Sequence, residues 1–246
     1  MLDAQHEAAR IASDWRIIAG GDGELPEVLA NAIATWEAAD AVPPPAPPIT
    51  AAEITPANAT DALYGAADAA IRAEKFHQTK NQITGQLARW VLGAATQAAP
   101  EILDRMKPEF DGAVDEFRQA VQQLPDNYHD PAKLVARGPA AVEAYHHAIK
   151  AQGRLKKFDG FIASIPGSNL SGRGDYHVLR LLRPVDRAGY QGLLNAANGR
   201  HKTELSPVFL YAVENHIDWQ LNHPAAQKEI ADAINSQPMP NRSRGW

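Results

Sequence analysis

The stretch "EILDRMKPEFDGAVDEFRQAVQQL", residues 101–124, has the most regular spacing of apolar side chains in the chain. Successive apolar residues are 3, 4, 4, 3, 4 and 3 positions apart. This near-3.5 repeat predicts a long amphipathic helix that packs along another helix in the manner of a coiled coil. We expect its apolar stripe to meet another part of the same chain, or else a second copy in a homo-oligomer. The stripe comprises Leu103, Met106, Phe110, Val114, Phe117, Val121 and Leu124.

A second helical pattern precedes this stretch and ends at Pro100. It begins after the Thr55-Pro56 start signal and places Leu63, Ile71, Ile83 and several neighbours on one expected buried face. Because an interior proline removes a backbone donor and clashes with the preceding turn, Pro100 predicts a break between the two helices. Residues 55–126 are therefore expected to form a long antiparallel helical hairpin.

Turn and start signals divide the remainder of the chain. Residues 1–41 indicate an N-terminal helical hairpin, and the proline-rich residues 42–54 indicate a semi-rigid linker. Residues 127–237 indicate a helix-rich domain with a short β-hairpin, whose strands we place at 161–166 and 176–182. Residues 238–246 form a tail. The predicted fold class is mainly α.

The composition favours a folded, cytoplasmic protein. Hydrophobic residues make up 45% of the 246 positions and charged residues 22%, as in globular proteins. The chain has no cysteine, which excludes disulfides, thiolate nucleophiles and cysteine-ligated metals. We see neither a signal peptide nor an apolar run long enough for a transmembrane helix. The alanine-rich, cysteine-free composition loosely resembles that of helical particle-assembly proteins from high-GC bacteria and their phages.

Positive charge is concentrated in residues 150–202. This segment carries ten lysines and arginines against three aspartates, although the whole chain has a net charge of −5. Such a segment could dock an acidic protein surface, its own or a partner's, or bind the phosphates of a nucleic acid with Tyr176 stacking on bases. Its members are Lys150, Arg154, Lys156, Lys157, Arg173, Arg180, Arg183, Arg187, Arg200 and Lys202.

A glycine-rich stretch, "SIPGSNLSGRGDYH" at residues 164–177, resembles a phosphate-binding P-loop only superficially. Arg173 stands where the lysine belongs, Gly174 offers no hydroxyl, and a strand-like pattern follows in place of a helix. The best enzyme hypothesis is a hydrolase that uses Ser164, Ser168 or a neighbouring serine with His177 as base. The histidines lack metal-ligand spacing, so we expect no metal and no cofactor.

Together these patterns favour a non-catalytic interaction or assembly protein over an enzyme. Its amphipathic helices would contact a protein partner or a second copy, and its basic segment would meet an acidic partner. A nucleic-acid-binding module and a hydrolase with its site at Ser164–His177 are the two alternatives.

Overall fold

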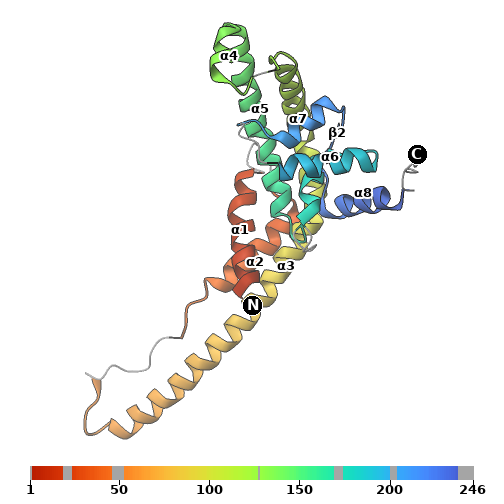
Figure 1. Cartoon of the computed structure of the whole chain (residues 1–246). Coiled ribbons are helices and arrows are strands. Elements are labelled where there is room, and N and C mark those ends of the chain that lie inside the picture. Colours follow the sequence, from red (N-terminus) through yellow and green to blue (C-terminus); the bar gives the residue numbers. More distant parts are fainter. Residues whose placement is uncertain are drawn as a thin grey trace. The chain divides into compact units, whose positions relative to one another are not determined.

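The computed structural model describes residues 2–18, 24–45, 53–126, 128–168, 174–199 and 204–237 (Figure 1). Within these ranges the chain forms eight α-helices and one two-stranded antiparallel sheet, which confirms the predicted mainly α fold. The chain divides into two compact units, Met1–Ala98 and Ala99–Trp246. One helix, α3 (Ala59–Gln122), contributes its first part to the N-terminal unit and its last part to the C-terminal unit.

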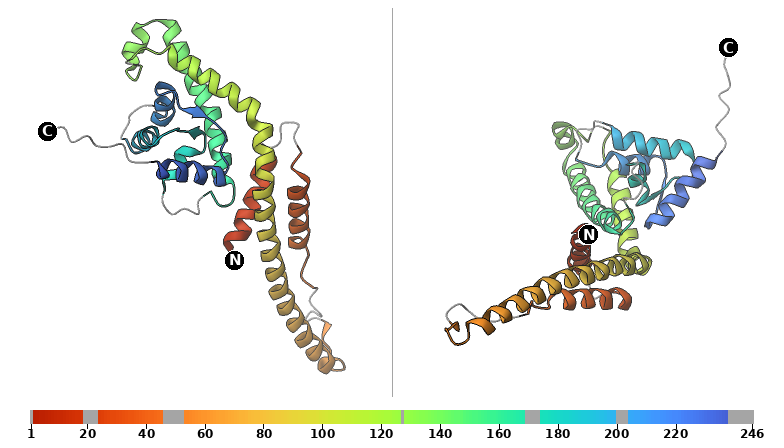
Figure 2. Two further views of the ribbon diagram at one scale, coloured as in Figure 1. Left: turned by 90° about the vertical axis from the view of Figure 1, so that its right-hand side faces the viewer. Right: turned by 90° about the horizontal axis from the view of Figure 1, so that it is seen from below.

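The N-terminal unit consists of α1 (Leu2–Ile18), α2 (Glu27–Asp40) and the first part of α3. Both views in Figure 2 show α1 and α2 on opposite sides of α3. Trp15, Leu29 and Ile33 are buried in its core, together with several alanines of α3. Polar contacts also join its helices: Gln5 Nε2 donates to Thr84 Oγ1 at 2.8 Å, and the Arg16 guanidinium binds the Glu37 carboxylate through two hydrogen bonds.

The start of α3 is held by a local turn rather than by the predicted Thr55 cap. Asn58 Oδ1 accepts a hydrogen bond from the Thr55 amide at 2.6 Å, and Asn58 Nδ2 donates to the Glu53 carbonyl. One turn of helix later than expected, α3 begins at Ala59. The side chain of Lys80 donates to the carbonyl of Val42 at 2.9 Å, so the first residues of the predicted linker lie against α3. Residues 46–52 of that linker lie outside the described residues.

The predicted break at Pro100 was wrong. Pro100 and Pro108 both lie inside α3, a single helix of 64 residues, so residues 55–126 contain no helical hairpin. Each proline removes one N–H and crowds the carbonyl four residues earlier, at Thr96 and Asp104. The residues that flank both prolines are good helix formers, and those beyond Ala99 have a buried apolar stripe. Packing of that stripe stabilises the helix by more than the two prolines cost it.

The C-terminal unit contains the last part of α3 and shorter elements around α5 (Pro139–Ser164). Residues typical of helix starts open several of these helices: Asp130 Oδ1 accepts from the Ala132 amide, Asp186 Oδ1 accepts from the Gly189 amide, and Pro224 opens the last helix. The other elements are α4 (Pro131–Ala136), the 3₁₀ helix η2 (Gly174–Leu179), β1 (Leu182–Arg183), α6 (Arg187–Asn198), α7 (Pro207–Glu214), β2 (Asp218–Trp219) and α8 (Pro224–Ser236).

A short antiparallel sheet is present, but its strands are not the predicted pair. Leu182 pairs with Trp219 and Arg183 with Asp218. Residues 161–164 belong instead to α5, where Phe161 and Ile162 continue its buried face. Helix α5 passes through Gly160 because that glycine lies on an exposed face with open space beside it. Strand β2 forms because α7 ends at Glu214 and His216 then adopts a positive φ of 52°, which turns the chain.

Aromatic side chains and buried amides hold the C-terminal unit together. Phe117, Phe209 and Trp219 contact one another with ring centroids 5.3–6.1 Å apart. The buried Gln152 side chain on α5 donates to the Glu204 carbonyl at 2.9 Å and accepts from the Ser206 amide. Asn222 Nδ2 donates to the Leu179 and Leu182 carbonyls. These amides fix the segments that lead into α7 and α8.

Candidate functional site

The apolar stripe of residues 103–124 packs within the C-terminal unit. Leu103, Phe110, Val114 and Phe117 are buried, whereas Met106, Val121 and Leu124 are half-buried. Phe110 meets Phe158 of α5 edge to face at 5.5 Å, and Phe117 contacts the α7 and β2 aromatics. We expected this stripe to meet either another part of the same chain or a second copy, and residues of the same chain pack against it.

The four arginines of the basic segment that the structure describes bind atoms of the chain itself. Arg154 forms a salt bridge with Glu116 of α3, and Arg180 with Asp159 of α5 at 3.3 Å. Two others donate to uncharged groups: Arg183 Nη1 to Gln220 Oε1 at 3.2 Å, and Arg187 Nη2 to the Asn235 carbonyl at 2.8 Å. These four arginines connect helices and strands of one unit, which gives the segment a structural role.

The lysines of the segment are placed differently. Lys150, Lys156 and Lys157 are exposed on α5, whereas three of the four arginines are half-buried. Lys150 also acts on Glu116, because its charge helps to lower the pKa of that carboxyl. Arg173, Arg200 and Lys202, the remaining members of the predicted segment, lie outside the described residues. The described part therefore presents three exposed lysines on one helix.

The carboxylates of the two salt bridges have pKa values that are shifted in opposite directions. The hydrogen bond from Arg154 holds the pKa of Glu116 below its ordinary value. Burial raises the pKa of Asp159 above its ordinary value, although the neighbouring charge of Arg180 and, to a smaller degree, that of His177 act to lower it. Desolvation thus outweighs attraction at Asp159 and not at Glu116, which is exposed. A raised carboxyl pKa can mark a catalytic acid, but here it follows from burial beside an arginine.

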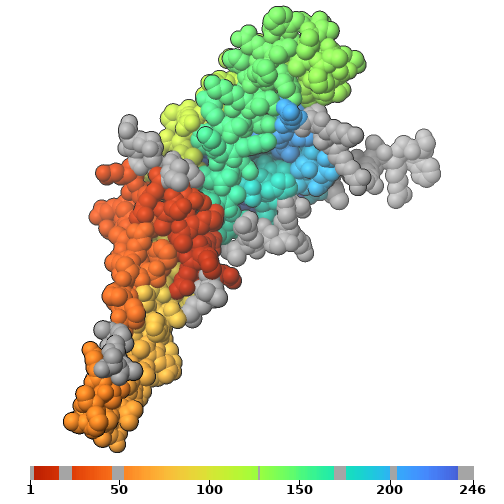
Figure 3. Space-filling view, turned by 90° about the vertical axis from the view of Figure 1, so that its left-hand side faces the viewer, coloured from red at the N-terminus to blue at the C-terminus, as the bar shows by residue number. Residues whose placement is uncertain are grey.

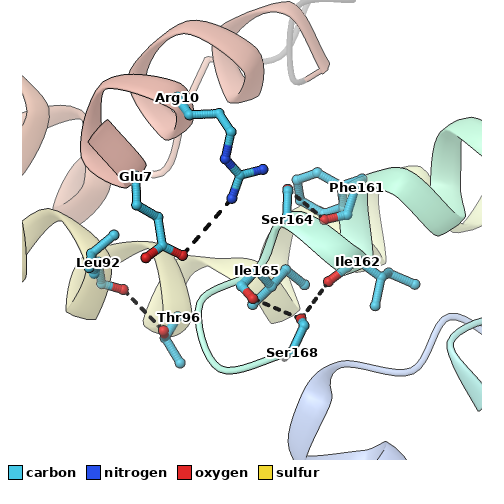
Figure 4. Close-up of polar contacts among 9 residues, drawn as sticks. All are labelled: Glu7, Arg10, Leu92, Thr96, Phe161, Ile162, Ser164, Ile165 and Ser168. Carbon is cyan, nitrogen blue, oxygen red and sulfur yellow. Dashed lines mark hydrogen bonds and ion pairs between the residues drawn. The ribbon is translucent and has the colours of Figure 1, made fainter. Parts of the chain in front are cut away.

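The serines of the proposed hydrolase site donate to main-chain carbonyls. Ser164 Oγ donates to the Phe161 carbonyl at 2.6 Å, and Ser168 Oγ is 2.7 Å from the carbonyls of both Ile162 and Ile165 (Figure 4). A hydroxyl that donates to a carbonyl does not present its proton to a histidine base. These bonds instead satisfy carbonyls at the end of α5, which does not favour the hydrolase alternative.

An exposed apolar surface on the first part of α3 was missed by the sequence analysis. Leu63, Ile71 and Ile83 were expected to be buried, but they are exposed, as is Tyr64. The periodic pattern could show that these residues share a helix and could not show whether anything covers them. Figure 3 shows the orange and yellow residues of this stretch at the surface. We call residues 63–83 the exposed segment of α3.

A groove in the described part of the C-terminal unit has mixed charge. Its volume is about 880 Å³, and Phe110, Val114 and Trp219 supply apolar walls. Four aspartates and three basic side chains surround it, so opposite charges compensate within the groove. The charged residues are Asp104, Lys107, Asp111, Asp115, Arg118, Arg183 and Asp218.

Among the described residues, no three His, Asp or Glu side chains lie close enough together to hold a metal ion. None of the described helices has an apolar stretch long enough to cross a bilayer. Comparison of the chain with models of protein families, with curated proteins and with solved structures finds no match.

Proposed function

We propose that the chain is a non-catalytic interaction protein and that the exposed segment of α3 is its main contact surface. One observation carries the proposal: none of residues 63–83 is buried, yet Leu63, Tyr64 and Ile71 are apolar and 68, 73 and 58% exposed. Large apolar side chains gathered on a monomer's surface are typical of a surface that another molecule covers.

The energetics of helices support the same proposal. A helix that lacks tertiary packing is marginally stable in water, because most helix stability in proteins comes from burying an apolar face. The exposed segment has good helix formers and local side-chain bonds, such as Gln78 Nε2 to Glu74 Oε1 at 3.0 Å, but these contribute only a few tenths of a kcal/mol each. A partner that buried Leu63 and Ile71 would supply the missing stabilisation.

The segment's composition favours a polypeptide partner. Alanines at 66, 67, 69, 70 and 73 allow another helix to approach closely, and charges of both signs lie among them. Residues 63–83 carry three basic side chains against two acidic ones, and a net charge of +1 is a weak attraction for nucleic-acid phosphates. We therefore propose that the partner presents an apolar helix face. A role in particle assembly rests on composition alone and stays a prediction, as do nucleic-acid binding and hydrolase activity.

A photocrosslinking amino acid at position 71, introduced in cells that produce the full chain, tests the proposal. We expect a discrete crosslinked product at position 71. The matched control is position 135, because Val135 on the short helix α4 is at least as exposed as Ile71, at 68% against 58%. A product of twice 26.6 kDa identifies a second copy as the partner, and any other discrete mass identifies a different protein. Equal crosslinking at both positions, or none at 71, would contradict the proposal.

A further inference from the structure

A second cavity of the C-terminal unit differs in charge from the mixed groove. Its volume is about 640 Å³, within the range of small-molecule sites, and helices α6 and α7 and Tyr128 line it. The side chains that supply its polar character are Tyr128, Asn195, Tyr211 and Glu214. The described residues of its lining include one carboxylate and no lysine, arginine or histidine. We call it the tyrosine cavity.

Tyr211 is held in place by a glycine. A Cβ atom built on Gly192 would lie 1.9 Å from Tyr211 Oη and 2.1 Å from Cζ, so the phenol end rests directly against the backbone of α6. Only glycine leaves room for this contact. The ring of Tyr211 is therefore positioned by α6 before any ligand arrives, which reduces the entropy lost on binding.

Tyr128 lies close to a second tyrosine, Tyr145, which contacts a carboxylate of its own. Its ring centroid lies 6.4 Å from that of Tyr145, whose hydroxyl donates to Glu204 Oε2 at 3.4 Å. Burial raises the pKa of Tyr128, and the negative charge of Glu214 raises it further. Burial and the charge of Glu204 likewise raise the pKa of Tyr145. Both phenols thus lie in the negative field of a nearby carboxylate.

We propose that the tyrosine cavity binds an alkylammonium group, with the ammonium beside Glu214 and the alkyl stem against Tyr128 and Tyr211. Aromatic faces attract cations through the ring quadrupole, and the attraction grows where water is partly excluded. A carboxylate at the rim adds a charge-assisted hydrogen bond to the ammonium. Leu210 and Pro207 supply apolar wall for the stem. Among the described lining residues, Glu214 carries the charge, and its carboxylate would repel an anion.

The test is an NMR titration of the full chain, labelled at tyrosine, with n-butylammonium at low ionic strength. We expect the signals of Tyr128 and Tyr211 to shift in a saturable manner, and added salt to weaken the binding. The neutral isostere 1-butanol has the same stem without the charge and should bind at least about tenfold more weakly. A blocked lysine, N-acetyl-lysine methylamide, distinguishes the source: tighter binding than butylammonium indicates a protein lysine, and weaker binding indicates a free amine.

Paired variants separate the roles of charge and ring. Glu214→Gln should weaken butylammonium about tenfold, whereas the control Glu229→Gln on α8 removes the same charge elsewhere and should change little. Tyr128→Phe keeps the aromatic face and should retain binding, while Tyr128→Leu should lose most of it. Equal binding of 1-butanol and butylammonium, equal effects of the two glutamine variants, or no saturable shift would overturn the proposal.

Discussion

The two parts of α3 have similar apolar content and opposite surroundings. In the C-terminal unit, Phe110 and Phe117 are at most 1% exposed, whereas in the N-terminal unit Leu63 and Tyr64 are about 70% exposed. The first pair is covered by α5, α7 and β2, and nothing in the described chain covers the second pair to a comparable degree. One continuous helix therefore has an exposed segment, residues 63–83, and contributes buried residues to the cores of both units beyond it. The difference lies in what packs against it.

Amide hydrogen exchange should show the largest contrast between the two parts. Amides of residues 66–82 lie in a stretch of helix without a buried side chain and should open locally, while those of residues 102–120 should open only with the whole unit. We expect the second group to exchange at least about 10³-fold more slowly than the first, given global stabilities of about 5 kcal/mol or more. Exchange of both groups at one rate would contradict the proposed difference.

Two alanine substitutions in the same helix sharpen the comparison. Phe117→Ala removes a fully buried ring that contacts Phe209 and Trp219 and should lower the free energy of unfolding by about 3–5 kcal/mol. Tyr64→Ala should change it by no more than about 0.5 kcal/mol, because the ring is exposed. Urea denaturation of both variants measures the difference. A large loss for Tyr64→Ala would mean that this side chain is already covered in the isolated protein.

Replacement of two glycines by alanine compares the effect of one added methyl group in open space and in filled space. Gly153 of α5 has no atom within 4 Å of an added Cβ, so Gly153→Ala should stabilise the protein by about 0.5–1 kcal/mol. Gly192→Ala drives a methyl group into Tyr211 and should cost about 1–3 kcal/mol. Thermal unfolding of the two variants should move in opposite directions. Stabilisation by both would show that Tyr211 moves away freely.

Local chemistry in the sequence was a good guide to where most helices begin, but it gave the wrong end for the helix that precedes Pro100. Asp130, Asp186 and Pro224 mark helix starts because a cap or a first-turn proline acts within a few residues. Pro100 failed as a stop signal because packing far along the chain outweighs its cost. The two-residue strands are too short to leave a pattern, so their positions could not be predicted.

The candidate sites depend on contacts that no local pattern records. Residues 103–124 were predicted as a packing stripe, and its buried members do pack. The bonds of the basic segment to Glu116 and Asp159 depend on how α3, α5 and η2 meet, which sequence spacing does not reveal. The tyrosine cavity combines Tyr128 with residues of α6 and α7, far along the chain. Only the fold brings these side chains together.

Pro100 lies next to the boundary between the two units of the chain. Cutting a helix in its interior normally strands up to four N–H groups at the new start, but proline has no N–H to strand. The boundary between the two units falls at Ala98 and Ala99, so a chain cut there would place Pro100 in the first turn of its new first helix. In the interior of α3 this residue weakens the helix, whereas in a first turn it favours one. Pro100 therefore lies in the interior of the longest helix, although it is better suited to the first turn of a shorter helix.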